Sequence, residues 1–304
     1  MELRERNKTE ETLKEKLRVK WNTRDFTPKE QNNNLFGMNF FFISFVSLLI
    51  ESLFYLVPRV YAETRWITSL VTLFLFCETI VNWHRSYFDT ENYVKAETKE
   101  KYFPDSDETP ADWKSCFKCQ VDVPPRAYHC KHCGKCMLKR VHHCFLTGSC
   151  IGFHNQKFFI MFCLWTAVCL GFCLNLQLSF LHADLPLNSF EIFTYLPPVA
   201  LVKYIMGSIS FMQAFIATHC FITGGSFITA VLAFLWHIFL LFEGLTMYEG
   251  FKGIYGYAGT RMENITSVFG SVLTIPVLLF VPYRFENPMN GIQWKLRNKR
   301  DKGH

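Results

Sequence analysis

The sequence predicts an all-α polytopic membrane protein with four transmembrane helices and a cysteine-rich cytosolic module between the second and third helices. Half of the 304 residues are hydrophobic and 32 are phenylalanine, a composition typical of membrane proteins. Four apolar runs approach the roughly 20 residues that cross a bilayer. Seven of the 12 cysteines lie between Cys116 and Cys150, where histidines alternate with them.

The order of charged and apolar segments predicts how the chain is divided. The first thirty residues are strongly charged and contain no apolar signal core, so they indicate a tail rather than a leader. The four predicted spans are Leu35–Val57, Trp66–Trp83, Phe158–Leu181 and Ser226–Phe242. The predicted division is therefore a cytosolic N-terminal tail (1–34), transmembrane helices 1 and 2 (35–83), a cytosolic cysteine-rich zinc domain with a catalytic motif (84–157), transmembrane helices 3 and 4 with a luminal loop (158–242), and a cytosolic C-terminal tail (243–304).

The basic residues predict the orientation of the spans. Lysines and arginines number 9 in residues 1–34, 12 in 84–157 and 8 in 243–304, but only 2 in 58–65 and 1 in 182–225. Basic residues accumulate on the cytosolic side of a membrane. Both termini and the cysteine-rich domain are therefore expected in the cytosol, with the Golgi or the endoplasmic reticulum as the expected membrane and the plasma membrane as an alternative.

Two apolar stretches compete with this count of spans. Val199–Cys220 is apolar enough to span apart from Lys203, but we predict a luminal or membrane-dipping segment. Leu273–Val281 is too short to span and is expected on the membrane surface. Asn264 begins an Asn-Ile-Thr glycosylation sequon, and its glycosylation would contradict the four-span arrangement.

The cysteine-rich domain contains the ligands of two metal sites. Structural zinc takes four nitrogen or sulfur ligands in a tetrahedron, so eight such residues within 35 positions predict two zinc ions. The module is too short to build its own core, and metal binding is expected to supply much of its folding free energy. The eight candidate ligands are Cys116, Cys119, His129, Cys130, Cys133, Cys136, His143 and Cys150.

Cys144 remains as an extra thiol beside the ligands. It lies two residues from His142, and a histidine near a thiol can raise the fraction of the nucleophilic thiolate. The module runs almost directly into the third span, so Cys144 is expected near the cytosolic membrane surface. A long-chain acyl-CoA, with its head in water and its tail in lipid, is a substrate that fits this location.

These motifs closely resemble those of the DHHC-type protein S-acyltransferases, or palmitoyltransferases. The resemblance covers the cysteine-rich domain, the four spans and parts of the C-terminal tail. It rests on the spacing of the eight ligands together with His142-His143-Cys144, Asn155 and Phe159. Thr246-Met247-Tyr248-Glu249 resembles the Thr-Thr-x-Glu motif of the family, and Asn264 resembles its C-terminal asparagine element.

The resemblance implies a role for each matching residue. Cys144 would accept an acyl chain from acyl-CoA as a thioester and pass it to a cysteine of a membrane-associated client protein, with His142 as its base. The chain would lie in a cavity among the spans, which Cys169 and Cys173 would line if their helix face turns inward. One implied zinc ion has the ligands Cys116, Cys119, His129 and Cys136, and the other has Cys130, Cys133, His143 and Cys150.

The catalytic motif departs from the family pattern at three positions. Val141 replaces the aspartate before the two histidines, and Phe145-Leu146 replaces Pro-Trp after the cysteine. In serine proteases an equivalent aspartate fixes the histidine tautomer, and disabling it costs about 10⁴ in kcat. Another carboxylate, with Glu249 as one candidate, or a backbone carbonyl is expected to orient His142.

Three functions therefore compete at the level of sequence. The first is a working protein-cysteine S-palmitoyltransferase, and the second is a weak or inactive relative that binds clients or partners an active enzyme. The third is a membrane-anchored zinc module that binds nucleic acid or protein. It is disfavoured because 9 acidic residues accompany the 12 basic ones in residues 84–157, which is unlike a concentrated nucleic-acid footprint. Expected partners are acyl-CoA, client proteins and the bilayer, without nucleic acid. Lys139 and Arg140 are candidates for binding the CoA phosphates, or alternatively lipid headgroups.

Overall fold

The structure is a computed structural model. It describes residues 28–88, 91–95, 97–103, 110–182, 185, 189–257, 259–283, 285, 287 and 289–294. The predicted N-terminal tail and the end of the predicted C-terminal tail therefore lie largely outside the described residues.

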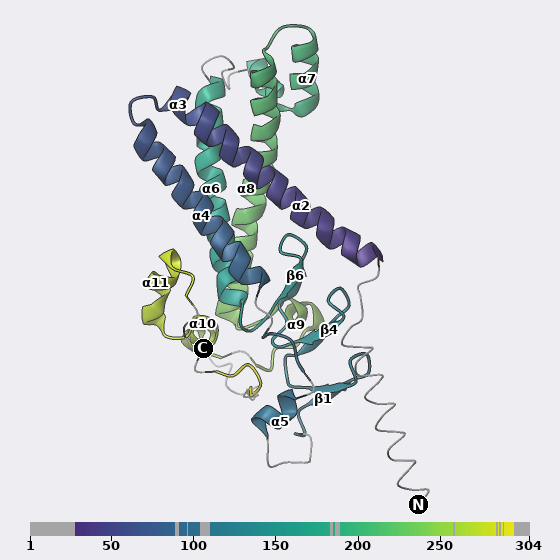
Figure 1. The fold of residues 1–304 in the computed structure, drawn as a ribbon. Helices are drawn as coiled ribbons and strands as arrows, with labels where there is room; N and C mark the ends of the chain where they lie inside the picture. The colour runs from purple at the N-terminus through teal and green to yellow at the C-terminus, as the bar shows by residue number, and fades with distance from the viewer. Residues whose placement is uncertain are drawn as a thin grey trace, which may run out of the picture.

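Four helices in the described part of the chain are long and apolar enough to cross a membrane. These are Leu35–Val60, Arg65–Tyr87, Gln156–His182 and Phe211–Glu243. Each contains one of the four predicted spans. The third of them, α6 (Gln156–His182), packs against both α4 (Arg65–Tyr87) and α8 (Phe211–Glu243), as Figure 1 shows. The helical membrane fold predicted from the apolar runs is thus present.

The first span changes its helical geometry at Glu51. It consists of α2 (Pro28–Ile50), a six-residue π-helical segment η1 (Glu51–Leu56) and the short α3 (Val57–Val60). Such π-helical segments are rare and occur frequently at functional sites. Here the segment begins at a buried carboxyl group, since the Glu51 residue is only 5% exposed.

The fourth span begins earlier than the sequence predicted. Helix α8 starts at Phe211, where Ser210 accepts a hydrogen bond from the backbone N–H of Gln213 and forms a capping box with it. The predicted start at Ser226 was wrong because the two preceding glycines lie inside a continuous helix. The stretch Val199–Cys220 consequently forms no span of its own. Its first part lies in α7 (Pro197–Ile205) and its last part in α8.

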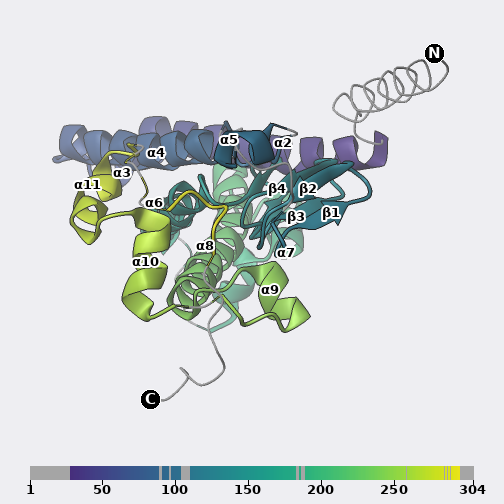
Figure 2. The same ribbon diagram turned by 90° about the horizontal axis from the view of Figure 1, so that it is seen from below.

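The remaining elements gather at the two ends of the helix bundle. The 3₁₀ segment η2 (Ser189–Tyr195) and α7 lie at one end, with α3. At the other end Figure 2 shows the strands and α9, with α10 and α11 beside them. The elements of this second end are α5 (Thr98–Tyr102), β1 (Lys114–Cys116), β2 (Val121–Val123), β3 (Tyr128–Cys130), β4 (Lys135–Met137), β5 (His142–Cys144), β6 (Ser149–Ile151), α9 (Met247–Lys252), α10 (Arg261–Phe269), η3 (Val272–Thr274) and α11 (Ile275–Phe280).

Helix α10 carries the asparagine that the sequence analysis singled out. The Asn264 side chain donates to the carbonyl oxygens of Phe242 and Gly259, at 2.9 and 3.2 Å, and its residue is 6% exposed. It thereby holds the end of α8 against the following loop. The segments Arg261–Phe269 and Val272–Phe280 are bent by 54° and together are apolar enough to be a broken span or a re-entrant loop.

Candidate active site and metal centre

Three β-hairpins of identical design hold the cysteine and histidine side chains. The strands pair antiparallel as β1–β2, β3–β4 and β5–β6. The second hairpin pairs His129 with Cys136 across its strands, and the third pairs His143 with Cys150. Each of these cross-strand pairs meets the Cys-x-x-Cys turn of the preceding hairpin. The hairpins are therefore linked in series by shared clusters.

The eight predicted ligands form two groups of four. One group contains Cys116, Cys119, His129 and Cys136, and the other contains Cys130, Cys133, His143 and Cys150. This is the grouping that the family resemblance implied. Its interleaving has a local cause, because neighbouring residues of a strand point to opposite faces. His129 and Cys130 are neighbours on β3, and they therefore belong to different groups.

The ligand atoms in each group have the separations that a tetrahedral metal site requires. The Sγ atoms of Cys130, Cys133 and Cys150 lie 3.7, 3.3 and 3.6 Å from Nδ1 of His143. In the other group the Sγ to Nδ1 distances lie between 3.2 and 4.0 Å. Neighbouring ligands of a tetrahedral zinc ion lie about 3.6 Å apart, given the usual zinc–sulfur and zinc–nitrogen bond lengths. Both groups therefore fit a metal ion of this kind.

The same alternation along β5 separates the reactive pair from the metal ligand. His143 points toward its three cysteines, so His142 and Cys144 share the opposite face of the strand. That face is covered by α4, α6 and α8. Cys144 lies in an apolar cluster with Trp83, Phe159 and Cys163, and its residue is 8% exposed. The hairpin thus presents the candidate base and nucleophile to the helix bundle.

Burial controls the ionisation of both side chains. It lowers the pKa of His142 to about 3, with further lowering by the nearby His237, His143 and Arg140. Burial raises the pKa of the Cys144 thiol, against the opposing effect of hydrogen bonds from Thr147 and Leu146. Both groups are therefore neutral at physiological pH, an imidazole and a thiol on one face of the strand.

An internal cavity of about 540 Å³ begins beside this face. Its wall includes Leu146 and Phe159 near the hairpin and reaches Leu48 and His219 deeper in the bundle. Along α6 it extends from Phe159 to Leu170, which is about 16 Å at the rise of an α-helix. The lining is overwhelmingly apolar. The space is therefore elongated and suited to a hydrocarbon chain.

The two cysteines of α6 differ in their surroundings. Cys169 lines the internal cavity. Cys173 is fully buried, and its Sγ accepts from Ser52 Oγ at 3.6 Å. The sequence placed both on one helix face, and the structure brings only Cys169 to the cavity wall.

Glu249 does not orient His142, contrary to the candidate role considered from the sequence. Arg126 donates to both of its carboxylate oxygens at 2.7 Å, from Nε and Nη2, and both side chains are at most 2% exposed. Oε2 of Glu249 also accepts from the backbone N–H of Thr246, whose hydroxyl accepts from the backbone N–H of Glu249. This family-like stretch is thus a capping box for α9 that anchors the hairpins to the C-terminal segment.

Lys139 and Arg140 have different environments. Lys139 is 3% exposed and its Nζ lies 3.5 Å from Ser267 Oγ, while burial and Arg126 lower its pKa well below the usual value. Arg140 is half-buried and lines an open pocket of about 530 Å³ together with Lys118 and Lys131. Of the two residues, only Arg140 lines this basic pocket.

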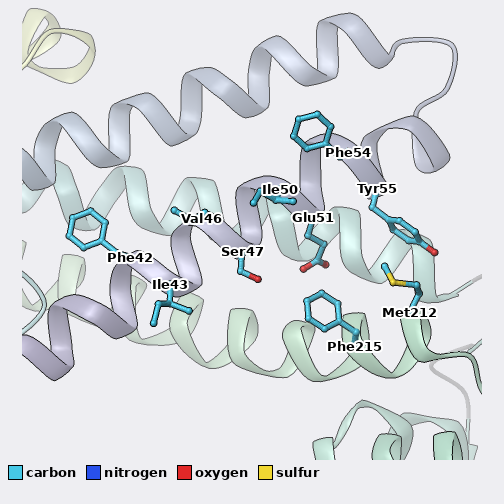
Figure 3. Close-up of a pocket in the computed structure, with 10 residues that line it drawn as sticks. All are labelled: Phe42, Ile43, Val46, Ser47, Ile50, Glu51, Phe54, Tyr55, Met212 and Phe215. Atoms are coloured by element: carbon cyan, nitrogen blue, oxygen red, sulfur yellow. The ribbon is translucent and has the colours of Figure 1, made fainter.

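A second cavity, of about 830 Å³, lies on the outside of the bundle between the first span and α8. Figure 3 shows Glu51 among its lining residues, with the carboxyl group directed toward Phe215 of α8. Glu51 accepts from Gln177 Nε2 at 3.0 Å and pairs with Nδ1 of His219. His219 in turn lines the internal cavity. This polar contact therefore separates the outer groove from the internal cavity and joins three spans.

The described residues thus combine four helices that are long and apolar enough to cross a membrane with two four-residue clusters that could each hold a metal ion. Residues 110–254 match the family model described as DHHC palmitoyltransferase. This match to a little under half of the chain agrees with the resemblance predicted from the motifs.

Individual relatives give the same result. The chain is 33% identical over 164 residues to "Probable palmitoyltransferase ZDHHC24" of Rattus norvegicus, covering 52% of this chain and 56% of the relative. It is also 33% identical over 176 residues to "Palmitoyltransferase ZDHHC22" of Danio rerio, covering 54% of this chain and 64% of the relative. The chain thus matches little more than half the length of these relatives.

Val141 and Met247, two of the positions that depart from the family motifs, belong to one apolar cluster of the structure. Val141 is 1% exposed, and it packs in the same apolar cluster as Met247, which replaces the second threonine of the Thr-Thr-x-Glu motif. An apolar pair therefore occupies the place where the family pattern has an aspartate and a threonine. The sequence revealed both substitutions but did not reveal that the two residues share one cluster.

The apolar surroundings of Val141 predict that Val141→Asp alone does not restore a family-like site. A lone carboxylate in an apolar cluster is expected to destabilise the fold by about 1–3 kcal/mol. The double variant Val141→Asp/Met247→Thr supplies a hydroxyl beside the carboxylate and should recover part of that loss. The test is a double-mutant cycle. Thermal unfolding and the rate of acyl-thioester formation are measured for both single variants and for the double variant. Purely additive effects would show that positions 141 and 247 do not interact.

Proposed function

We propose that this protein is a protein-cysteine S-palmitoyltransferase that works through a thioester on Cys144. The observation that carries the proposal is the position of His142 and Cys144 on one strand face. Cys144 packs in one apolar cluster with Phe159 and Cys163, and both of these residues line an elongated apolar cavity. Such a cavity receives a long acyl chain and leaves its carbonyl carbon near the thiol. The match of residues 110–254 to the palmitoyltransferase family model supports the same reaction.

The reaction has two balanced transfers. In the first, His142 takes the proton of Cys144, the sulfur attacks the thioester carbon of acyl-CoA, and the carbon–sulfur bond to CoA breaks. The proton then passes to the leaving CoA sulfur. In the second, a thiol of a membrane-associated client protein loses its proton to His142 and attacks the Cys144 thioester. Cys144 leaves as a thiol after receiving that proton.

The surrounding groups bind and position the substrates. The open basic pocket of Lys118, Lys131 and Arg140 would hold the CoA phosphates as charge-assisted hydrogen-bond donors. The two ligand clusters would each hold a structural zinc ion, which supplies folding free energy to the hairpins. The basic segments favour an orientation with both termini and the hairpins in the cytosol.

Incubation of the purified full-length protein with a palmitoyl-CoA analogue tests this proposal. The wild type is expected to acquire a label that hydroxylamine removes, because thioesters are cleaved by that reagent. Cys144→Ser should lose the label completely, whereas Cys77→Ser should retain it because Cys77 lies exposed on α4 outside both clusters. A correctly folded wild type that takes no label would refute the transferase and favour a client-binding protein that partners an active enzyme.

A further inference from the structure

A second histidine lies against His142, on a helix that is otherwise apolar around it. His237 of α8 is 4% exposed, and its ring stacks on the His142 ring with centroids 5.0 Å apart and planes inclined by 26°. Phe159 of α6 meets both rings edge to face, at 4.9 Å from each. Three aromatic rings from β5, α6 and α8 thus form one closed cluster.

No carboxylate holds His142 in the part of the chain that the structure describes. Its buried Nδ1 has no hydrogen-bond partner there, and neither has the buried Nδ1 of His237. Val141 and Met247 occupy the neighbouring apolar cluster, and Glu249 is fully engaged by Arg126. Buried polar atoms without partners are rare in folded proteins and require an explanation. Two of them on stacked rings beside a candidate nucleophile point to a functional cause.

We propose that His237 is a positioning residue for His142 and takes over the orienting role of the aspartate that Val141 replaces. The inference rests on the proposed transferase function and adds a residue to its site. The stacked ring of His237 fixes the plane of the His142 imidazole, and Phe159 blocks rotation toward α6. The base is thereby held by ring contacts instead of a hydrogen bond to a carboxylate.

The geometry explains why such contacts are sufficient for orientation. Aromatic pairs in stacked and edge-to-face arrangements are stabilised beyond simple burial, because the negative face of one ring attracts the positive edge of the other. Two such contacts on one imidazole ring strongly favour a single orientation over the alternatives. The helices that supply His237 and Phe159 pack directly against each other, so the orienting groups are themselves fixed.

Replacement of His237 by leucine and by phenylalanine tests the inference. Leucine fills the space but offers no ring face, and we expect the rate of Cys144 acylation at saturating acyl-CoA to fall about 10- to 100-fold. The half-saturating acyl-CoA concentration should stay unchanged, because His237 does not line the cavity. Phenylalanine keeps the ring face and should recover most of the rate. Equal rates in His237→Leu and wild type, or equal losses in both variants, would overturn the proposal.

A second readout separates this inference from the transferase proposal. The rate at which N-ethylmaleimide alkylates Cys144, followed by peptide mass spectrometry, depends on His142 as a base but requires no acyl-CoA. The alkylation rate is expected to be highest in the wild type, lower in His237→Phe and lowest in His237→Leu. If the wild type takes no acyl chain but keeps this order, the transferase proposal fails and the positioning role stands. Identical alkylation rates in all three proteins would reject the positioning role.

Discussion

With one metal ion in each ligand group, as proposed, replacing Cys130 by alanine is expected to lower the metal content from two ions to one and to unfold the third hairpin. Cys130 is fully buried in the cluster with Cys133, His143 and Cys150. Structural zinc sites in small modules bind with about 10–16 kcal/mol, which exceeds the stability that such short hairpins gain by themselves. Because His143 lies between His142 and Cys144, the loss of this site should also abolish acylation. Metal analysis of the purified protein and hydroxylamine-sensitive labelling provide the measurements.

Two further cysteine variants serve as controls for this prediction. Cys77→Ala removes an exposed cysteine of α4 and should leave two metal ions bound. Cys116→Ala removes a ligand of the other cluster, which lies one hairpin further from Cys144. It should release one metal ion with a smaller effect on acylation than Cys130→Ala. Retention of both ions in Cys130→Ala would contradict the metal assignment of this cluster.

Arg126→Met is expected to destabilise the protein by about 3–5 kcal/mol, because it leaves the Glu249 carboxylate buried without its cationic partner. The same arginine donates to the carbonyl oxygen of Gly244 at 2.8 Å and packs over the Trp294 ring. Its loss therefore detaches the hairpins from the end of α8 and from the C-terminal segment. Thermal unfolding in detergent, followed by tryptophan fluorescence, measures the effect.

An exposed ion pair of the same protein serves as the control for this prediction. Lys203 and Glu191 are 2.6 Å apart, but their side chains are 29% and 43% exposed. Lys203→Met should cost far less stability than Arg126→Met, since water solvates the remaining carboxylate. The double variant Arg126→Met/Glu249→Gln removes the buried charge, keeps the capping group and should recover part of the stability. Equal losses for Arg126→Met and Lys203→Met would show that burial of the pair is not decisive.

Much of the architecture could be predicted because apolar runs and paired cysteines are local signals. Each predicted span lies inside a helix of the structure, since about 20 apolar residues leave few alternatives. The start of α8 was missed because Gly224 and Gly225 resembled a helix boundary. The Ser210–Gln213 capping box was a visible signal for the true start. The π-helical turn at Glu51 had no corresponding sequence pattern.

The site was predictable in its residue types but not in its contacts. Spacing supplied the ligands of the metal clusters, whereas their division follows from the alternation of side chains in three hairpins. Glu249 ends the stretch that resembles the family's Thr-Thr-x-Glu motif. In the structure its carboxylate pairs with Arg126, which lies 123 residues away in the chain. His237 was overlooked, although a histidine within an apolar span is a functional candidate by default. Its contact with His142 becomes evident only from the packing of α8 on β5.

The contact between Glu51 and His219 has a consequence for how the protein is made. Glu51 lies in the first of the four long apolar helices that the structure describes, and His219, which is 168 residues later in the chain, belongs to the fourth. A carboxyl group at the middle of an isolated transmembrane helix costs about 3 kcal/mol on insertion. The first helix therefore remains poorly suited to lipid until the fourth is inserted beside it. Stable insertion of the first helix in the bilayer thus depends on insertion of the fourth.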